Sequence, residues 1–359
     1  MTNYYVSPSG NDSNSGAAGF PWLTPQRASG HLLPGDTLWV LAGTYNQDST
    51  TNKFLYTTDI GTPLQRITYR SVTPLGAKIT SSGLGSPPVA WYNQGDYCDF
   101  IGFDITTGGT DGLECNASHC RLFSMFAHDV TAFPGASAAG SGIKLGSGFT
   151  DNWVYNSVVD HISNLTGTDP NNQCHGIYMS SSFGGIWNCK ASRAGGWGFH
   201  LFHTSTGCSV FNCLAYNNGC GGYMIAADSV PNAGTTVANC IAYNNLNLAS
   251  GGGYGLREAG VTGLNIYTNN CFFGNAVAPF GLITGGSSVV NSVLADPKFV
   301  NYQPDNSGDY HLLPSSPCID MGIASGSPPT DFYNLNRCSG LGVDIGPYEI
   351  QQTTYHGAG

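Results

Sequence analysis

Short stretches of the chain alternate between apolar and polar residues with a period of two, which is the pattern of strands with one buried face. Five of these stretches share a glycine, an apolar residue, a variable residue and usually a second apolar residue. They are SGIKLGSG (141–148), HGIYMSSS (175–182), WGFHLFHT (197–204), YGLREAGV (254–261) and FGLITGGS (280–287). Glycine, asparagine and serine separate the stretches, and no segment has sustained helical periodicity. The pattern therefore predicts an all-β chain of short strands.

A second stretch, in which asparagine precedes cysteine, recurs between the glycine stretches. The Asn-Cys pairs fall at 188/189, 212/213, 239/240 and 270/271, so the intervals are 24, 27 and 31 residues. A repeat of this length with two strand-like stretches is typical of a solenoid. We expect a buried, reduced stack of cysteines beneath a ladder of hydrogen-bonded asparagines. The cysteines are Cys189, Cys213, Cys240 and Cys271, and the asparagines are Asn188, Asn212, Asn239 and Asn270.

Composition narrows the classes of partner. Of the 359 residues, 41% are apolar and 12% aromatic, so the chain has the material for a packed core. Its net charge of -10 and its 12 basic residues argue against nucleic acid, because no basic patch is available to neutralise phosphates. No apolar run reaches the roughly 20 residues of a membrane span. The opening MTNYYVSPSGND lacks the pattern of a signal peptide, and we expect a secreted protein whose signal has been removed.

The 12 cysteines raise the question of metal binding and disulfides. No CxxC pair and no zinc-type spacing of cysteine and histidine is present, so we expect no structural metal site. Cys318 and Cys338 lie in a loop-rich region near the C-terminus. They are the only candidates for a disulfide.

The two ends of the chain carry a family resemblance. The opening YYVSPSGND…LLPGDTLWVLAGTY (4–45) and the closing ADPKFVN…DYHLLPSSPCIDMG…GVDIGPYE (295–349) resemble the corresponding segments of right-handed parallel β-helix proteins of the pectate-lyase-like superfamily. The resemblance implies a single right-handed solenoid of roughly eight to eleven coils, with a cap at 1–58, coils at 59–300 and an irregular segment at 301–359 packed on the last coils. This superfamily contains lyases, hydrolases, epimerases, phage depolymerases and non-enzymes, so the resemblance implies the fold and leaves the reaction open.

In such a fold, the variable residue of each glycine stretch faces solvent and stacks on its equivalents about 4.8 Å away. The apolar residues expected inside are Leu113, Ile143, Ile177, Phe199, Tyr223, Leu256 and Leu282. The outward ladder is Glu114, Lys144, Tyr178, His200, Met224, Arg257 and Ile283. We therefore expect Lys144, Tyr178 and His200 to lie on consecutive coils, within about 10 Å of one another.

Other residues are expected beside this ladder. The aligned turn positions before the glycine strands hold His128, His161 and Arg193, while His175 and His203 flank the ladder itself. Aromatic residues such as Trp197 can either stack on sugar rings or cap the coils. The candidate substrate-binding residues are Glu114, His161, His175, Arg193, Trp197, His203 and Arg257.

A groove with this set of residues suits β-elimination of a uronic-acid polysaccharide, which needs a cation for the carboxylate, a base for the C5 proton and an acid for the leaving oxygen. We assign Lys144 or His200 as the base and Tyr178 as the acid or proton relay, and Arg193 and Arg257 as partners of carboxylates. Cationic neighbours are expected to lower the pKa of Lys144.

The resemblance also bears on cofactors. SGIKLGSG is similar to the lysine-bearing strand of superfamily lyases, some of which recruit calcium through clustered Asp side chains. Ser141 stands where such an Asp is expected. The ladder offers no Asp cluster, so no cofactor is predicted and calcium is not supported.

Two other functions stay open. A glycoside hydrolase needs two carboxylates about 5 to 10 Å apart, and Asp228 with Glu258 is the alternative catalytic pair. The other is a non-catalytic glycan-binding or phage-spike protein. In each case the expected partner is a polysaccharide, with neither nucleic acid nor membrane involved.

Overall fold

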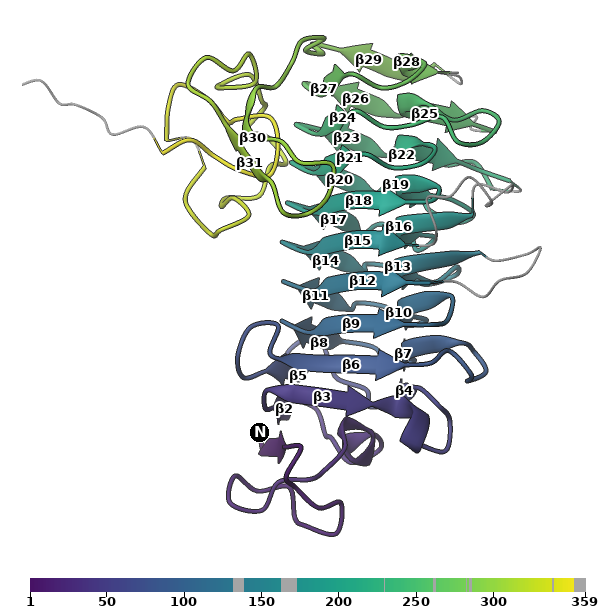
Figure 1. Ribbon diagram of the computed structural model, residues 1–359, viewed down its shortest axis with the longest axis vertical. Helices are drawn as coiled ribbons and strands as arrows, with labels where there is room; N and C mark the ends of the chain where they lie inside the picture. Colours follow the sequence, from purple (N-terminus) through teal and green to yellow (C-terminus); the bar gives the residue numbers. More distant parts are fainter. Residues whose placement is uncertain are drawn as a thin grey trace, which may run out of the picture.

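The computed structural model describes residues 1–131, 139–162, 173–228, 230–260, 263–281, 283, 286–337 and 339–351. The strands form three long parallel sheets that run the length of the molecule (Figure 1). Sheet 1 has 11 strands and sheets 2 and 3 have nine each. Because every coil contributes one strand to each of sheets 2 and 3, the described residues form nine complete coils, from β2–β3–β4 to β26–β27–β28.

The bounds of the strands follow this order. Sheet 1 consists of β1 Asn3–Val6, β2 Thr37–Val40, β5 Ile67–Ser71, β8 Cys98–Ile101, β11 Arg121–Phe123, β14 Trp153–Tyr155, β17 Gly185–Trp187, β20 Ser209–Phe211, β23 Thr236–Ala238, β26 Ile266–Thr268 and β29 Ser288–Val290. Sheet 2 consists of β3 Gly43–Asn46, β6 Ala77–Ser81, β9 Asp104–Thr107, β12 Phe126–Val130, β15 Val158–Ile162, β18 Lys190–Ala194, β21 Leu214–Tyr216, β24 Ile241–Tyr243 and β27 Cys271–Phe273. Sheet 3 consists of β4 Leu55–Thr57, β7 Val89–Asn93, β10 Asp111–Cys115, β13 Gly140–Leu145, β16 Cys174–Met179, β19 Trp197–Leu201, β22 Gly221–Ala226, β25 Tyr254–Ala259 and β28 Ala278–Gly281.

This architecture is the right-handed parallel β-helix that the sequence predicted. The described residues contain no α-helix, and their only helical turns are the 3₁₀ segments η1 (Pro25–Ala28) and η2 (Gln47–Ser49). None of these segments is long and apolar enough to cross a lipid bilayer. Strand pairing begins with β1 on β2, so the first complete coil lies inside the segment expected to be the cap. Ala28 and Leu32 from that segment join the core of the solenoid.

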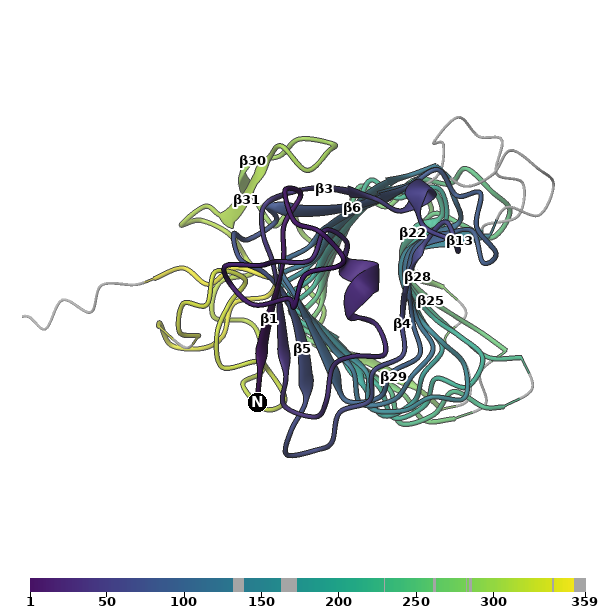
Figure 2. The same cartoon turned by 90° about the horizontal axis from the view of Figure 1, so that it is seen from below.

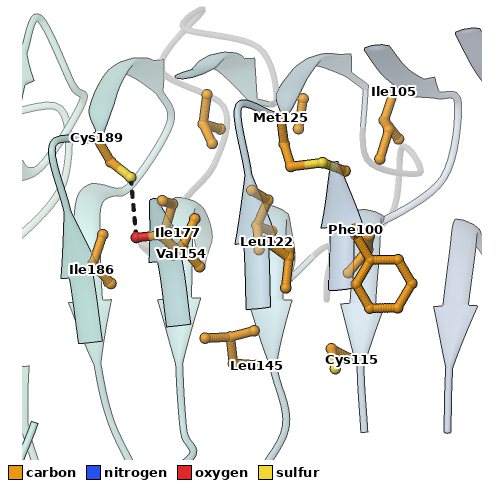
Figure 3. Packing of buried hydrophobic residues seen from close by; sticks show 14 of the residues in the cluster. Phe100, Ile105, Cys115, Leu122, Met125, Leu145, Val154, Ile177, Ile186 and Cys189 are labelled. Carbon is orange, nitrogen blue, oxygen red and sulfur yellow. Dashed lines mark hydrogen bonds between the residues drawn. The ribbon is translucent and has the colours of Figure 1, made fainter. Parts of the chain in front are cut away.

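The interior is a stack of apolar columns. Phe100, Leu122, Val154 and Ile186 lie in register on four successive strands of sheet 1 and are fully buried (Figure 3). The thiol of Cys189 points into the same interior and donates to the backbone oxygen of Val154 at 3.6 Å. Burial of about 0.8 kcal/mol per methylene along such columns is the main force that holds the coils together.

The predicted cysteine stack is partly confirmed. Cys189, Cys213 and Cys240 are buried, free and in register, and the backbone N–H of Cys189 donates to the Cys213 sulfur at 3.4 Å. The fourth position of this column is Asn270, whose side chain accepts from the N–H of Cys240 at 2.9 Å. Cys271 is also buried and free, but it pairs with Ile241 on the outward side of sheet 2. The alignment was wrong by one residue there, because the doubled asparagine of NNC allows either register.

The asparagines before the cysteines differ from the predicted ladder. Asn188, Asn212 and Asn239 occupy left-handed turn positions, with φ near +54°, which asparagine tolerates better than most residues. In the fourth coil Asn269, with φ of 52°, takes this position in place of Asn270. Their amides reach mainly across to residues after 320, as in the bond from Asn212 to the Asp344 carbonyl at 3.1 Å.

A run of asparagines hydrogen-bonded along the axis occurs at the next turn instead. The Asn218 amide donates to the Asn245 side chain at 3.0 Å, and the Asn245 amide donates to the Asn275 side chain at 2.8 Å. Each bond ties one coil to the next.

The segment from 296 to 351, here called the C-terminal segment, leaves the coils and lies along their side. Its only strands are the antiparallel pair β30 (Phe299–Asn301) and β31 (Asp309–Leu312). Phe299, Tyr310 and Leu312 pack on the outward side chains of sheet 2. Viewed along the axis, this segment and sheet 3 lie on opposite sides of the solenoid, so sheet 3 keeps an open outer face (Figure 2). Cys318 is free and buried, while Cys338, its predicted partner, lies outside the described residues.

Candidate functional site

The outward residues of sheet 3 form two files. The first file is the predicted ladder, and strand pairing confirms it for Glu114, Lys144, Tyr178, His200, Met224 and Arg257. The seventh member was wrong, because Arg257 pairs with Gly281 and Ile283 packs against the core. Three residues earlier on each strand lies the second file, which consists of Asp111, Ser141, His175, Trp197, Gly221 and Tyr254. The expected inward residues are fully buried, except that Leu282 lies outside the described residues.

Glycine separates the two files because the strand bends there. A Cβ atom at Gly142 would lie 2.2 Å from Val159, and one at Gly176 would lie 2.9 Å from Ala191. Both neighbours are buried residues of sheet 2, so only glycine fits. The bend turns two side chains of the same strand, three residues apart, toward solvent. This is the physical reason for the repeated glycine in the sequence.

The two files line a groove with a volume of about 970 Å³. Its walls include Asp111, Glu114, Lys144, His175, Tyr178, Trp197, His200, His203, Asp228 and Arg257. Seven of the candidate site residues named by their position in the ladder or beside it are therefore brought together with Lys144, Tyr178 and His200 at one surface. A groove of this size is large enough for several sugar units.

Lys144 lies between two acidic residues. Its Nζ atom is 3.0 Å from Glu114 and 3.9 Å from Asp111. Burial alone favours the neutral amine, but the two carboxylates outweigh it and raise the pKa of Lys144. The prediction that cationic neighbours lower this pKa was wrong, because the nearest charges are negative. Lys144 is therefore an ammonium at neutral pH.

Asp111 is a groove residue that the sequence analysis missed. Burial raises its pKa to about 6, with Lys144 opposing and Glu114 reinforcing the shift. The stretch DGLEC places Asp111 three residues before Glu114, which is the spacing of His175 to Tyr178 and of Trp197 to His200. That shared spacing was the signal that could have identified the second file.

A backbone N–H fixes the protonation of His175 and His200. The N–H of Trp197 donates to Nδ1 of His175 at 3.2 Å, so the proton of a neutral His175 is on Nε2. That nitrogen lies 2.9 Å from Nδ1 of His200 and donates to it. The proton of His200 is then on Nε2, which is buried and has no hydrogen-bond partner among the described residues. Burial lowers the pKa of His175 to about 3 and that of His200 well below its usual value, so both rings are neutral.

Tyr178 and His203 lie beside this pair. The ring of Tyr178 stacks on His175, with centroids 5.4 Å apart, and lies 6.1 Å from the ring of His203. Burial raises the pKa of Tyr178, so it is a phenol at neutral pH. Nδ1 of His203 lies 2.7 Å from the Asp228 carboxylate, which can only accept. Nδ1 therefore carries a proton, and a neutral His203 presents the lone pair of Nε2.

Arg257 carries a charge without an acidic partner. One of its terminal nitrogens donates to the Gly251 carbonyl, and its guanidinium lies 5.7 Å from the centre of the Tyr254 ring. Its Nε is buried with no hydrogen-bond partner, and no carboxylate of the described residues lies within 4.0 Å. Arg257 is thus the cation of the groove that is available to an acidic ligand.

Three of the predicted residues do not meet in the groove. His161 and Arg193 occupy left-handed corner positions at the ends of β15 and β18 in sheet 2. His161 pairs with Asp129 at 2.5 Å, and Arg193 forms two bonds with Asp160 at 2.6 and 2.9 Å. Glu258 follows Arg257 in the alternation of β25 and points into the core, where Ser287 donates to it at 2.6 Å. The pair Asp228 and Glu258 is therefore separated by the wall of the solenoid.

The turn alignment also contained an error. The residue equivalent to His161 and Arg193 in the preceding coil is Asp129, with φ of 49°, rather than His128. His128 pairs with Asp160 across the sheet-2 strands and lies 3.0 Å from Asp104. Among the described residues, no group of three or more His, Cys, Asp or Glu side chains is arranged to hold a metal ion.

Comparisons with known proteins bear on the fold. No protein-family model and no curated protein matches the chain. Among solved structures, the pectate lyase Pel9A has a TM-score of 0.67 at 17% identity, covering 97% of this chain and 96% of its own. A rhamnogalacturonan lyase has a TM-score of 0.62 at 16% identity, covering 84% and 91%. An alginate lyase from Paenibacillus sp. str. FPU-7 has a TM-score of 0.53 at 16% identity, covering 82% and 99%. The chain thus has the right-handed parallel β-helix fold of the pectate-lyase-like superfamily.

Proposed function

We propose that the protein cleaves a uronic-acid-containing polysaccharide by β-elimination in the groove on sheet 3. The observation that carries this proposal is the set of side chains that one groove collects. Arg257 offers a guanidinium without an acidic partner, Tyr178 offers a phenol, and His203 offers an imidazole backed by Asp228. The structures that share this fold include a pectate lyase, a rhamnogalacturonan lyase and an alginate lyase.

Elimination needs three groups in one place. A cation stabilises the C6 carboxylate as the C5 proton is lost, a base takes that proton, and an acid protonates the oxygen that leaves C4. The electron pair of the C5–H bond becomes the new C4–C5 double bond. The electron pair of the broken C4–O bond stays on the departing sugar oxygen, which takes up the proton of the acid.

Two of these roles follow from charge and protonation. Arg257 binds the carboxylate, because a guanidinium can donate two parallel bonds to it. Tyr178 protonates the leaving oxygen, because its raised pKa keeps the phenol protonated at neutral pH. His200 donates from Nε2 to a substrate oxygen and does not act as the base, since its Nδ1 lone pair is taken by His175.

We assign the base at neutral pH to His203. Its Nε2 lone pair is accessible, and Asp228 stabilises the imidazolium that forms when it takes a proton. Lys144 becomes a base only at alkaline pH, because Asp111 and Glu114 raise its pKa. Lys144 and Arg257 are also four coils apart, about 19 Å between their backbones at 4.8 Å per coil. The two side chains therefore serve different sugar units.

The test follows the ultraviolet absorbance of the unsaturated product across a panel of uronate polysaccharides. We expect Tyr178→Phe and His203→Ala each to lower kcat by about 10²–10⁴-fold at neutral pH. His311→Ala is the matched control, because His311 also pairs with an aspartate, Asp309 at 2.6 Å, but in the C-terminal segment. If Lys144→Ala abolishes activity and His203→Ala keeps it at neutral pH, the base is Lys144.

Glycoside hydrolysis is a second candidate, favoured by one observation. Asp111 and Glu114 are a pair of groove carboxyl groups, and the pKa of Asp111, about 6, suits a general acid. Hydrolysis produces new reducing ends without unsaturated sugar, so the same assay separates the two reactions. Retention of a polysaccharide without either product would favour the non-catalytic glycan-binding role.

The proposed substrate also bears on location and cofactor. Polysaccharides with uronic acids are components of extracellular matrices and cell walls, so we propose that the protein acts outside the cell. Calcium stays untested, and the assay therefore includes parallel reactions with added calcium and with a chelator. Calcium-independent activity is the expected result.

A further inference from the structure

The charges of the groove are unusually well compensated. Its walls hold three carboxylates, Asp111, Glu114 and Asp228, and two cations, Lys144 and Arg257. Lys144 lies against Glu114 and Asp111 at 3.0 and 3.9 Å, so its charge is already neutralised. His175 and His200 share one proton between their facing nitrogens, with a backbone N–H on the other side, and add no charge.

Only Arg257 remains as a cation without an acidic partner among the groove residues that the structure describes. Its guanidinium is held by the Gly251 carbonyl and the Tyr254 ring, neither of which carries a charge. Its buried Nε lacks a hydrogen-bond partner, so a ligand oxygen would complete its coordination. The groove therefore contains one built position for a carboxylate.

The remainder of the groove suits uncharged sugar. It spans six strands of sheet 3, from β10 to β25, which is roughly 24 Å at 4.8 Å per coil and enough for several sugar units. Phe149, Phe202 and Met224 give partly exposed apolar surface between the polar groups. Such surface packs against the C–H faces of sugar rings.

A polymer with a carboxylate on every sugar conflicts with this surface. When one carboxylate reaches Arg257, the others would lie along Asp228, Glu114 and Asp111 with no cation left to meet them. The net charge of the whole chain, -10, adds to the repulsion.

We propose that the substrate is a sparsely charged heteropolysaccharide, in which a uronate is flanked by neutral sugars and its carboxylate binds Arg257. This inference rests on the proposed elimination and names the class of substrate for the same groove. Homopolymers of uronate are then poor substrates.

The test uses a graded series of polymers made from one parent. Carboxyl groups of polygalacturonate, and in parallel of alginate, are reduced stepwise to primary alcohols, and rhamnogalacturonan serves as a natural polymer of alternating uronate and neutral sugar. We expect the rate of unsaturated product per remaining uronate to rise at partial reduction and to vanish at full reduction. A maximum on either unreduced polymer, with or without added calcium, would overturn the inference.

Variants identify the carboxylate position. Arg257→Met should lower kcat/KM on the best polymer by roughly 10- to 100-fold, the loss expected for a charge-assisted pair. Arg70→Ala is the control, because Arg70 is exposed on sheet 1, stacked on Trp39, and lies outside the groove. Equal activity of the parent and Arg257→Met would remove Arg257 from the substrate site.

The two proposals fail in different ways. If no polymer gives unsaturated product, the elimination is wrong, and the retardation of the same polymers in affinity electrophoresis still tests the charge preference. Stronger retention of the partly reduced polymers supports the inference. Stronger retention of the unreduced polymers overturns it.

Discussion

The N–H of Trp197 controls which nitrogen of His200 carries a proton, although the two groups do not touch. Because this N–H occupies Nδ1 of His175, the proton of His175 points at His200 and forces the second proton outward onto Nε2. His175 is thus a positioning residue for His200. The arrangement supplies the groove with a neutral donor whose protonation does not change across ordinary pH.

The first prediction follows from this tautomer. His200→Gln keeps an N–H donor near the position of Nε2, whereas His200→Ala removes it. We expect His200→Ala to lose about 10²–10³-fold in kcat, the usual cost of one donor to a developing charge, and His200→Gln to recover part of that loss. Kinetics on the best polymer, together with ¹⁵N chemical shifts of the imidazoles, check it. Equal inactivity of the two variants would favour a proton-transfer role instead.

At the scale of the strand, two rules of the sequence were sufficient for the ladder from Glu114 to Arg257. The alternation of side chains and the glycine bend fix which residue faces outward. The same alternation placed Glu258 inside, a consequence that the search for carboxylate pairs overlooked. The second file was missed because the bend interrupts the alternation, so that residues three apart share a face.

The turns were harder to predict than the strands. Corner residues such as His161 and Arg193 adopt the left-handed conformation, which turns their side chains toward aspartates of sheet 2 and its edges instead of the groove. Spacing along the chain does not reveal this change of direction. The register slip at Asn270 had a similar origin, because two adjacent asparagines compete for one left-handed position.

A prediction at this scale concerns Asn212, which joins a turn of the solenoid to the C-terminal segment. Its buried amide donates to the carbonyls of Asp344 and Gly346, both at 3.1 Å. Asn212→Ala should lower the free energy of unfolding by about 1–3 kcal/mol through the unpaired carbonyls, with additional strain from φ of 54°. Asn212→Gly removes the amide without the strain, so urea unfolding of both variants separates the two costs. An unchanged stability of Asn212→Gly would show that the amide bonds contribute little.

At the scale of the whole molecule, the C-terminal segment covers one side of the solenoid and leaves sheet 3 open on the other (Figure 2). Lys190 of β18 is buried at the contact between the two parts. Its Nζ atom lies 5.1 Å from the centre of the Phe332 ring and 5.3 Å from that of Tyr310, and it donates to Asn306 at 3.1 Å. All three partners belong to the C-terminal segment, so this lysine couples the docking of the segment to pH.

The last prediction is the sign of that coupling. Burial lowers the pKa of Lys190 from 10.5 to about 8 in the folded protein, with Asp160 and Asp309 opposing the shift. Between these two values the unfolded chain holds a proton that the folded chain does not, so stability from this residue rises with pH, by up to about 3 kcal/mol. Below pH 8 the cost of the buried charge is fully present. Lys190→Met lacks that cost, so we expect its free energy of unfolding to exceed that of the parent near neutral pH. The difference should shrink as the pH approaches 10.5, and urea unfolding at several pH values measures it. A difference that stays constant with pH would mean that Lys190 does not lose its proton in the folded protein over this range.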